Sequence, residues 1–273
     1  MIPLPSLHPL AGTAIPGSWM IGTADGDQAD GRLAIFPILK RLTPTSIGLI
    51  GTGFYLQPKG GFATAAHVAQ EAQELIATNP DSVGIADTLP NGSIKFRPIW
   101  KFFMHETADV AFGIPRYEFV DDKTGMAYRA KVLSLTTTQP AIESIISTWS
   151  YPLHQVVGDA ATGQLIHLQP DFYDGALQEF YAERGPSVKL RPPYYRTNIH
   201  LHGGSSGGPV FNGAGDVFGV ASSSFEGEPD LAFVTPASAL LEIEIPEIIT
   251  DQTESGNKIS LQCLANIKKI LAK

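Results

Sequence analysis

The chain has 273 residues, of which 43% are hydrophobic, so it can bury a core without disulfides or metals. Its net charge is -8 and its Lys and Arg residues are not clustered, which argues against nucleic acid or an anionic membrane surface as partner. Its single cysteine, Cys263, excludes an internal disulfide and a metal site built from several thiolates.

The amino-terminal segment does not have the pattern of a secretory signal. MIPLPSLHPLAGTAIPGSW lacks a basic start, and prolines interrupt its apolar residues. No stretch approaches the roughly 20 apolar residues of a membrane-spanning helix. Together with the single cysteine, which suits a reducing compartment, these features predict a cytoplasmic protein that binds no membrane.

Short apolar runs separated by turn residues predict a mostly β chain, with an irregular arm at residues 1–15. The strand candidates of the first half are Leu33–Leu39, Ile47–Leu56, Ile94–Phe103 and Val110–Ile114. The polar stretch EFVDDKTGMAYR predicts a linker at residues 121–130, which would divide the chain into compact halves at residues 16–120 and 131–250.

The second half continues the pattern of short strands. Its candidates are Lys131–Leu135, Ile142–Tyr151, Gln164–Leu168, Pro209–Asn212, Val217–Ser222 and Leu231–Val234. An insertion at residues 170–195, rich in Tyr, Phe and Pro, either covers a cleft, contacts another chain or forms plain surface loops. Within residues 251–273, helical spacing of apolar residues from Lys258 to Leu271 predicts a closing helix packed on the second half, with Cys263 in its core.

One glycine-rich stretch has the composition of a nucleophile loop. HLHGGSSGGPVFNGAGDVFGVASSS, from His200 to Ser224, places Ser206 among glycines. An acyl-transfer nucleophile needs backbone that approaches a carbonyl closely and points N–H groups at the oxyanion, and glycine leaves room for both. Because a plain Gly/Ser turn is the commoner origin of such a stretch, Ser206 needs partners elsewhere in the chain.

His67 and Asp109 are the candidate partners. His67 follows small residues at 63–66, where a strand would end and a short helix begin, although a lone histidine there is more often an ordinary core residue. Asp109, in TADVAFGIP, precedes a strand of buried character. A carboxylate in such a place needs a donor such as an imidazole N–H.

Together the three segments resemble the chymotrypsin-like (trypsin-like) serine protease family. TAAHV matches its histidine motif, ADVAF its aspartate motif and GSSGGPV its GxSGGP serine motif, in the family's order. The resemblance covers residues 51–236 and is closest to the disulfide-free bacterial branch. It implies an all-β fold of two packed antiparallel six-stranded β-barrels with a carboxy-terminal α-helix, and an active site in the cleft between the barrels.

Two other hydrolase arrangements fit the sequence less well. GSSGG also matches the GxSxG elbow of α/β-hydrolases, but that fold needs a histidine after the serine, and all seven histidines precede Ser206. A subtilisin-like order would use Asp25, Asp27 or Asp30, and none of these has the strand-end setting of Asp109.

The resemblance implies a serine endopeptidase that acts on proteins or peptides through an acyl-enzyme intermediate. His67 would take the proton of the Ser206 hydroxyl and return it to the leaving amine, while Asp109 orients the imidazole. The backbone N–H groups of Gly204 and Ser206 would form the oxyanion hole. The alternative is a catalytically silent or partner-activated protease-like binding protein. Such proteins have usually lost a member of the triad, and this sequence retains all three.

The resemblance also implies a set of substrate-binding residues. They are His200, Ser222, Ser223, Ser224 and Ala232. Residues 222–224 would form an edge strand to which a peptide adds, and Ser222 would also hydrogen-bond Asp109. At the pocket floor, His200 replaces the aspartate of trypsin-type enzymes, so a preference for Lys or Arg is not expected. His200 and His202 share a strand face but lack a third ligand, so no metal or other cofactor is predicted.

Overall fold

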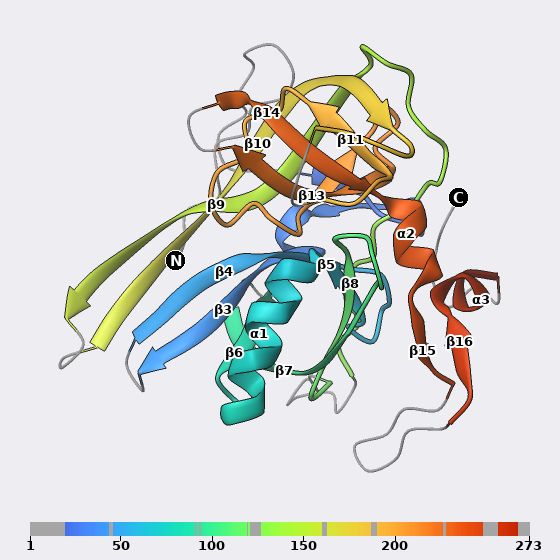
Figure 1. The fold of residues 1–273 in the computed structure, drawn as a ribbon. Coiled ribbons are helices and arrows are strands. Elements are labelled where there is room, and N and C mark those ends of the chain that lie inside the picture. Colours follow the sequence, from blue (N-terminus) through green and yellow to red (C-terminus); the bar gives the residue numbers. More distant parts are fainter. Residues whose placement is uncertain are drawn as a thin grey trace.

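The computed structural model describes residues 20–43, 46–90, 92, 94–118, 120, 127–159, 163–186, 190–225, 228–247 and 256–266. Two closed six-stranded barrels lie one above the other in Figure 1, which confirms the predicted fold class. The predicted arm at residues 1–15 and the start of the predicted linker, residues 121–126, lie outside the described residues. No helix in the described part of the chain is long and apolar enough to cross a membrane.

The first barrel closes in the strand order β3-β4-β5-β8-β7-β6, with antiparallel neighbours throughout. Its strands are β3 (Ile35–Thr43), β4 (Ser46–Tyr55), β5 (Phe62–Thr64), β6 (Val83–Thr88), β7 (Ile94–Met104) and β8 (Ala111–Pro115). The helix α1 (Ala66–Thr78) follows β5 and buries Val68, Ala69 and Ala72. Its apolar face therefore packs on the barrel, and its amino-terminal end lies where β5 ends.

The second barrel closes in the order β10-β11-β14-β13-β12-β9. Its strands are β9 (Ile145–Asp159), β10 (Gly163–Tyr181), β11 (Tyr194–Thr197), β12 (Pro209–Phe211), β13 (Val217–Phe225) and β14 (Glu228–Pro236). The β9–β10 hairpin extends well past the barrel (Figure 1). Much of the predicted insertion at residues 170–195 is therefore strand, and only residues 182–193 connect β10 to β11.

The predicted strand at Lys131–Leu135 is wrong. The segment is irregular, apart from one isolated bridge to β13, and it runs between the barrels. The N–H of Leu133 donates to the carbonyl of Tyr55 in the first barrel (3.3 Å), and the carbonyl of Ser134 accepts the N–H of Val217 in the second (2.8 Å). Because its backbone groups hydrogen-bond to one barrel and then to the other, the segment forms a continuous strand pairing with neither barrel. It connects the two barrels by hydrogen bonds instead.

The carboxy-terminal segment differs from its prediction in two respects. After α2 (Ala237–Glu242), β15 (Glu244–Pro246) pairs with β16 (Lys258–Ser260), so the helix α3 begins only at Leu261 and is described to Asn266. Cys263 is exposed, so its predicted core position is wrong. Among the described side chains of α3, Leu261 and Leu264 are buried. A small hairpin of β1 (Met20–Gly22) and β2 (Gln28–Asp30) precedes the short 3-10 helix at residues 31–33.

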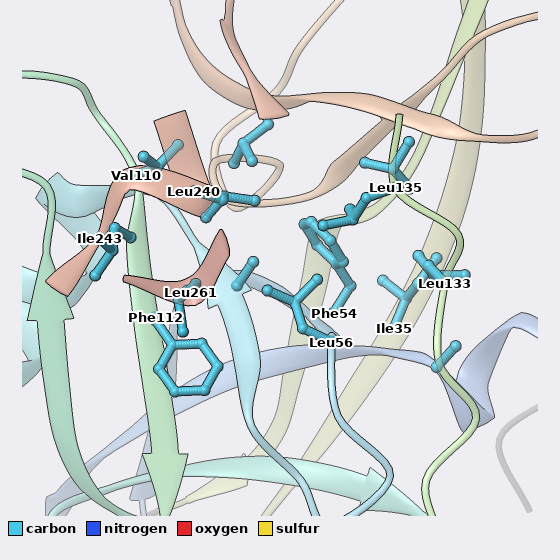
Figure 2. Packing of buried hydrophobic residues seen from close by; sticks show 14 of the residues in the cluster. Ile35, Phe54, Leu56, Val110, Phe112, Leu133, Leu135, Leu240, Ile243 and Leu261 are labelled. Atoms are coloured by element: carbon cyan, nitrogen blue, oxygen red, sulfur yellow. The ribbon is translucent and has the colours of Figure 1, made fainter. Parts of the chain in front are cut away.

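The largest apolar cluster lies where both barrels and the carboxy-terminal helices meet (Figure 2). β3 and β4 contribute Ile35 and Phe54, the segment between the barrels contributes Leu133 and Leu135, and α2 contributes Leu240. Residues of α3 belong to this cluster, which also includes residues of both barrels, so the closing helix does not pack on a core of the second half alone. Separating the barrels would expose this apolar surface to water, at a free-energy cost of about 25 cal/mol per Å². The cluster therefore opposes movement of one barrel relative to the other.

Thr52, in β4, joins the first barrel to the loop between β11 and β12. Its side chain is fully buried, and its backbone N–H donates to the carbonyl of Ser206 (2.8 Å). Its hydroxyl donates to the carbonyl of Gly204 (2.7 Å) and accepts the N–H of Tyr151 (3.1 Å). The Thr52 carbonyl accepts the hydroxyl of Thr64 (2.8 Å). A single residue therefore fixes this loop of the second barrel against the first.

Replacing Thr52 with valine should lower the free energy of unfolding by about 1–3 kcal/mol, because the Gly204 carbonyl and the Tyr151 N–H lose a partner in a buried place. Thr52→Ser keeps the hydroxyl and should retain most of the stability. Chemical denaturation of both variants measures the difference. An equal loss in the two variants would contradict the role given to the hydroxyl.

Candidate active site

His67 and Asp109 come from neighbouring segments of the first barrel. His67 lies at the start of α1, directly after β5, and Asp109 lies in the loop before β8. Because β5 and β8 are paired, with Thr64 opposite Ala111, both segments lie at the same end of the barrel. The Nδ1 atom of His67 lies 3.0 and 2.9 Å from the two carboxylate oxygens of Asp109. The structure thus brings these two predicted residues into direct contact.

Asp109 also stabilises the start of α1. The first N–H groups of a helix lack an intrahelical acceptor, and Ala65 at the N-cap offers none from its side chain. Asp109 Oδ1 accepts the backbone N–H of His67 (3.0 Å), and its charge lies at the positive end of the helix dipole. The Asp109 side chain is only 11% exposed, whereas that of His67 is 50% exposed. The carboxylate is therefore enclosed while the imidazole faces solvent.

Ser206 lies in the loop between β11 and β12, and glycines fix the path of this loop. Gly204 and Gly207 have φ angles of +95° and +88°, in the region that disfavours side chains. A Cβ at Gly204 would lie 2.6 Å from both Leu49 Cδ2 and the carbonyl oxygen of Tyr151. At Gly207 it would overlap β4 and β5. The glycines thus let the loop sit tightly between the two barrels.

The hydroxyl of Ser206 bonds to Ser222 and not to His67. Ser206 Oγ donates to the carbonyl oxygen of Ser222 at 3.1 Å. Among the described residues, no hydrogen bond joins Ser206 to the imidazole of His67. Ser206, His67 and Asp109 nevertheless line the same cleft. The three predicted residues share one site, with the histidine–aspartate bond made and the serine–histidine bond not made.

The N–H groups of Gly204 and Ser206 donate to no other group in the described part of the chain. The turn around them is closed by other donors, since the Ser205 N–H bonds to the carbonyl of His202 (3.0 Å) and the Gly208 N–H to the carbonyl of Ser205 (3.0 Å). Two free N–H groups in a glycine-rich turn beside a nucleophile can accept a developing oxyanion. Their assignment to an oxyanion hole stays a prediction.

The predicted hydrogen bond from Ser222 to Asp109 is wrong. Ser222 is fully buried, and its hydroxyl pairs with that of Thr235 in β14 at 2.7 Å. The register between β13 and β14 shifts across Ser222, which marks it as the extra residue of a β-bulge. The bulge places its side chain against β14, while Asp109 obtains its hydrogen bonds from α1.

A cleft of about 610 Å³ adjoins Ser206 and His67. Its lining includes His67, Asp109 and residues 104–108 from the first barrel, with Ser206, Ser222, Ser223 and residues 190–191 and 201–203 from the second. Two predicted pocket residues lie outside this lining. They are His200, whose ring centroid lies 4.1 Å from that of His202 with the two planes tilted by 58°, and Ala232, which is fully buried. The side chain of Ser224 lies outside the described residues.

His202 reaches the cleft in place of His200. Its ring contacts both His200 and Tyr173, with the latter centroid 5.5 Å away. Burial lowers the pKa of His202, and the neighbouring His200 lowers it further, while the charge of Asp171 acts in the opposite direction. Since the ordinary histidine value is about 6.5, His202 is mostly neutral at pH 7.

Sequence reasoning missed Thr52, Leu190 and Arg191. The sequence around Thr52 predicts only that it lies in a strand. Its hydrogen bond to Gly204 joins residues 152 positions apart, so no local pattern indicates it. Leu190 and Arg191 belong to LRPPYY, in the predicted insertion. Covering a cleft is one of the three alternatives that the sequence leaves open for this insertion, but no local pattern singles out these two residues.

The chain has two closed antiparallel barrels, with a contacting histidine and aspartate in the first and a serine in a glycine-rich loop of the second. These features define the chymotrypsin-like class of protease folds. The chain belongs to the trypsin-like peptidase domain family, whose model matches residues 51–220. A comparison with curated proteins found no match.

Solved structures of proteases share this fold. The active form of the Rv3671c protease from M. tuberculosis has a TM-score of 0.51 and 17% identity, covering 77% of this chain and 78% of that chain. Its inactive form has the same score and identity over 76% and 85%. The MamO protease domain from Magnetospirillum magneticum has a TM-score of 0.50 and 14% identity over 76% and 93%. Family membership indicates a protease, and these neighbours share the fold.

Substituting Gly204 with alanine should lower the free energy of unfolding by about 1–3 kcal/mol, because the left-handed conformation and the contacts with Leu49 and Tyr151 leave no room for a Cβ. Gly203→Ala is the matched control, since a Cβ there meets nothing within 4 Å. Thermal and chemical denaturation compare the two variants. Equal stabilities would show that the loop relaxes at no cost.

Proposed function

We propose that the chain is a serine endopeptidase that hydrolyses proteins or peptides through an acyl-enzyme intermediate, with Ser206 as nucleophile. The observation that carries this proposal is the contact between His67 Nδ1 and Asp109 in the cleft that Ser206 also lines. A buried carboxylate on Nδ1 favours the tautomer with a proton there, which leaves Nε2 free to accept a proton.

The chemistry of acyl transfer assigns a role to each group. As Ser206 attacks the carbonyl, His67 accepts its hydroxyl proton at Nε2 and then donates it to the leaving amine. Asp109 stabilises the imidazolium that forms between these steps. The N–H groups of Gly204 and Ser206 hold the oxyanion, and each such donor is typically worth about 2.7–4 kcal/mol of barrier. In the second half of the reaction, water attacks the acyl-enzyme, His67 accepts a proton from the water and returns it to Ser206, and the acyl group leaves as a carboxylic acid.

The backbone beside Ser206 offers a binding edge for an extended peptide. β12 pairs with β13 only at Val217–Val220, whereas Ser223 and Ser224 pair with β14 on the other side. In the described part of the chain, residues 222–224 therefore have one edge without a strand neighbour. A substrate strand that adds there brings its scissile carbonyl to Ser206.

A protease-like protein that binds without turnover, or that a partner activates, is the second candidate. One observation favours it: the Ser206 hydroxyl donates to Ser222 and not to His67. Catalysis requires the hydroxyl to leave that carbonyl and to reach the imidazole. In a latent enzyme this rearrangement needs a stimulus, whereas in an active one substrate binding to the edge at Ser222 suffices.

A fluorophosphonate probe tests the nucleophile directly, because only an activated serine reacts quickly. We expect rapid labelling of the unmodified chain, no labelling of Ser206→Ala, and unchanged labelling of Ser144→Ala, which lies outside the cleft lining. Mass spectrometry locates the adduct, and casein hydrolysis should disappear with it. Peptide hydrolysis retained by Ser206→Ala would remove the serine from its role, and labelling only after addition of a partner would favour the latent form.

Asp109→Asn should reduce kcat/KM by about 10³–10⁴-fold, because the amide stabilises the wrong histidine tautomer and cannot balance the imidazolium charge. Asparagine can still accept the backbone N–H of His67, so the start of α1 should persist. Steady-state kinetics on a peptide substrate, together with the melting temperature, separates catalysis from folding. A variant that keeps a tenth of the activity would refute the role of Asp109.

A further inference from the structure

The connection between β10 and β11 carries Leu190 and Arg191 to the cleft. Both residues are part of its lining, together with Ser222 and Ser223 of the proposed binding edge. They come from the second barrel, and the loop at residues 104–108 comes from the first.

A satellite core fixes this position. Leu190 is buried in a cluster with Tyr194 and Phe233, separate from the main cores. The rings of Tyr194 and Phe233 meet edge to face with centroids 5.1 Å apart. Phe233 is also the strand partner of Ser223. The residue before Arg191 is therefore packed on the strand next to the binding edge, which holds the backbone of Arg191 beside that edge.

The charges of the cleft differ between its two sides. Among the described residues that line the cleft, Arg191 is the only Lys or Arg. It is exposed and makes no hydrogen bond or ion pair with any other described residue. Among the lining carboxylates, Asp109 is held by His67, so Glu106 on the first-barrel side is the one without a partner in the cleft. Burial lowers the pKa of His202, so its ring adds little charge at pH 7.

We propose that Arg191 is a specificity-determining residue that binds the carboxylate of a substrate Asp or Glu side chain. This inference rests on the proposed protease function. Ser206 Oγ lies 3.1 Å from the carbonyl of Ser222, so the scissile bond sits at one end of the edge formed by residues 222–224. Because Leu190 packs on Phe233, the strand partner of Ser223, a peptide that extends along this edge passes beside Arg191.

The guanidinium suits this task for a physical reason. It stays charged at all relevant pH values, and its planar donors can bind both oxygens of one carboxylate. A substrate Lys or Arg at the same subsite would meet a like charge. The proposed preference for a substrate Asp or Glu therefore depends on the positive charge of the Arg191 side chain.

Cleavage of a proteome-derived peptide library, read by mass spectrometry, locates the position at which Asp and Glu are enriched. Two peptides blocked at both ends then carry Glu or Gln at that position, and the ratio of their kcat/KM values is the readout, because a general loss of activity cancels in it. The proteins are the unmodified chain, Arg191→Gln, Arg191→Glu and Arg184→Gln. Arg184 lies on the same connection but outside the cleft lining, which makes it the matched control.

The unmodified chain and Arg184→Gln should prefer the Glu peptide by about 3- to 10-fold, with a smaller ratio in 0.5 M salt. The ratio should fall to about 1 in Arg191→Gln and below 1 in Arg191→Glu. The proposal is overturned by an undiminished ratio in Arg191→Gln or by an unmodified chain that enriches no acidic position.

Failure of the protease function would look different, since the unmodified chain would then cleave no peptide and take no fluorophosphonate. In that case, fluorescence anisotropy measures the binding of a blocked Glu-rich peptide and its Gln counterpart to Ser206→Ala, with and without Arg191→Gln. Tighter binding of the Glu-rich peptide that disappears with Arg191→Gln supports the subsite, and equal binding of the two peptides overturns it.

Discussion

The contact between Thr52 and the loop of Ser206 is the constraint on which the site depends. The loop belongs to the second barrel, yet Thr52 of the first barrel binds the carbonyls of Gly204 and Ser206. Gly207 lets the backbones approach until a Cβ would no longer fit. Because these polar groups are buried, each lost partner is costly, and the loop is held against the barrel that carries His67.

The two halves of the site differ in how they are made. His67 and Asp109 meet through features of one barrel, namely the pairing of β5 with β8 and the unsatisfied N–H groups at the start of α1. The same carboxylate thereby serves the helix and the imidazole. Ser206 joins them only when the barrels dock, so its placement depends on the apolar cluster and on the irregular segment between the barrels.

In the proposed protease, the backbone edge and the charged side chains of the cleft divide substrate recognition between them. The edge at residues 222–224 can bind any extended chain, because its hydrogen bonds involve only main-chain groups. Discrimination among peptides must then come from side chains that line the cleft, where Arg191 and Glu106 supply opposite charges from different barrels. His202 lines the cleft, whereas His200, the predicted pocket residue, does not, and burial lowers the pKa of His202.

The sequence by itself determined the mostly β composition and the strands β4, β7 and β8 to within a few residues. It also determined Ser206 in its glycine-rich stretch, with its partner motifs, since periodicity and glycine content act locally. Tertiary structure decided what depends on distant partners. Residues 131–135 bridge the barrels, Ser222 bonds to Thr235 through a bulge, and pairing with β15 delays α3 and leaves Cys263 exposed. Tertiary structure also decided the positions of Thr52 and Arg191 at the site. Their hydrogen-bond partners and packing neighbours lie far along the chain, so no periodic pattern in the sequence indicates them.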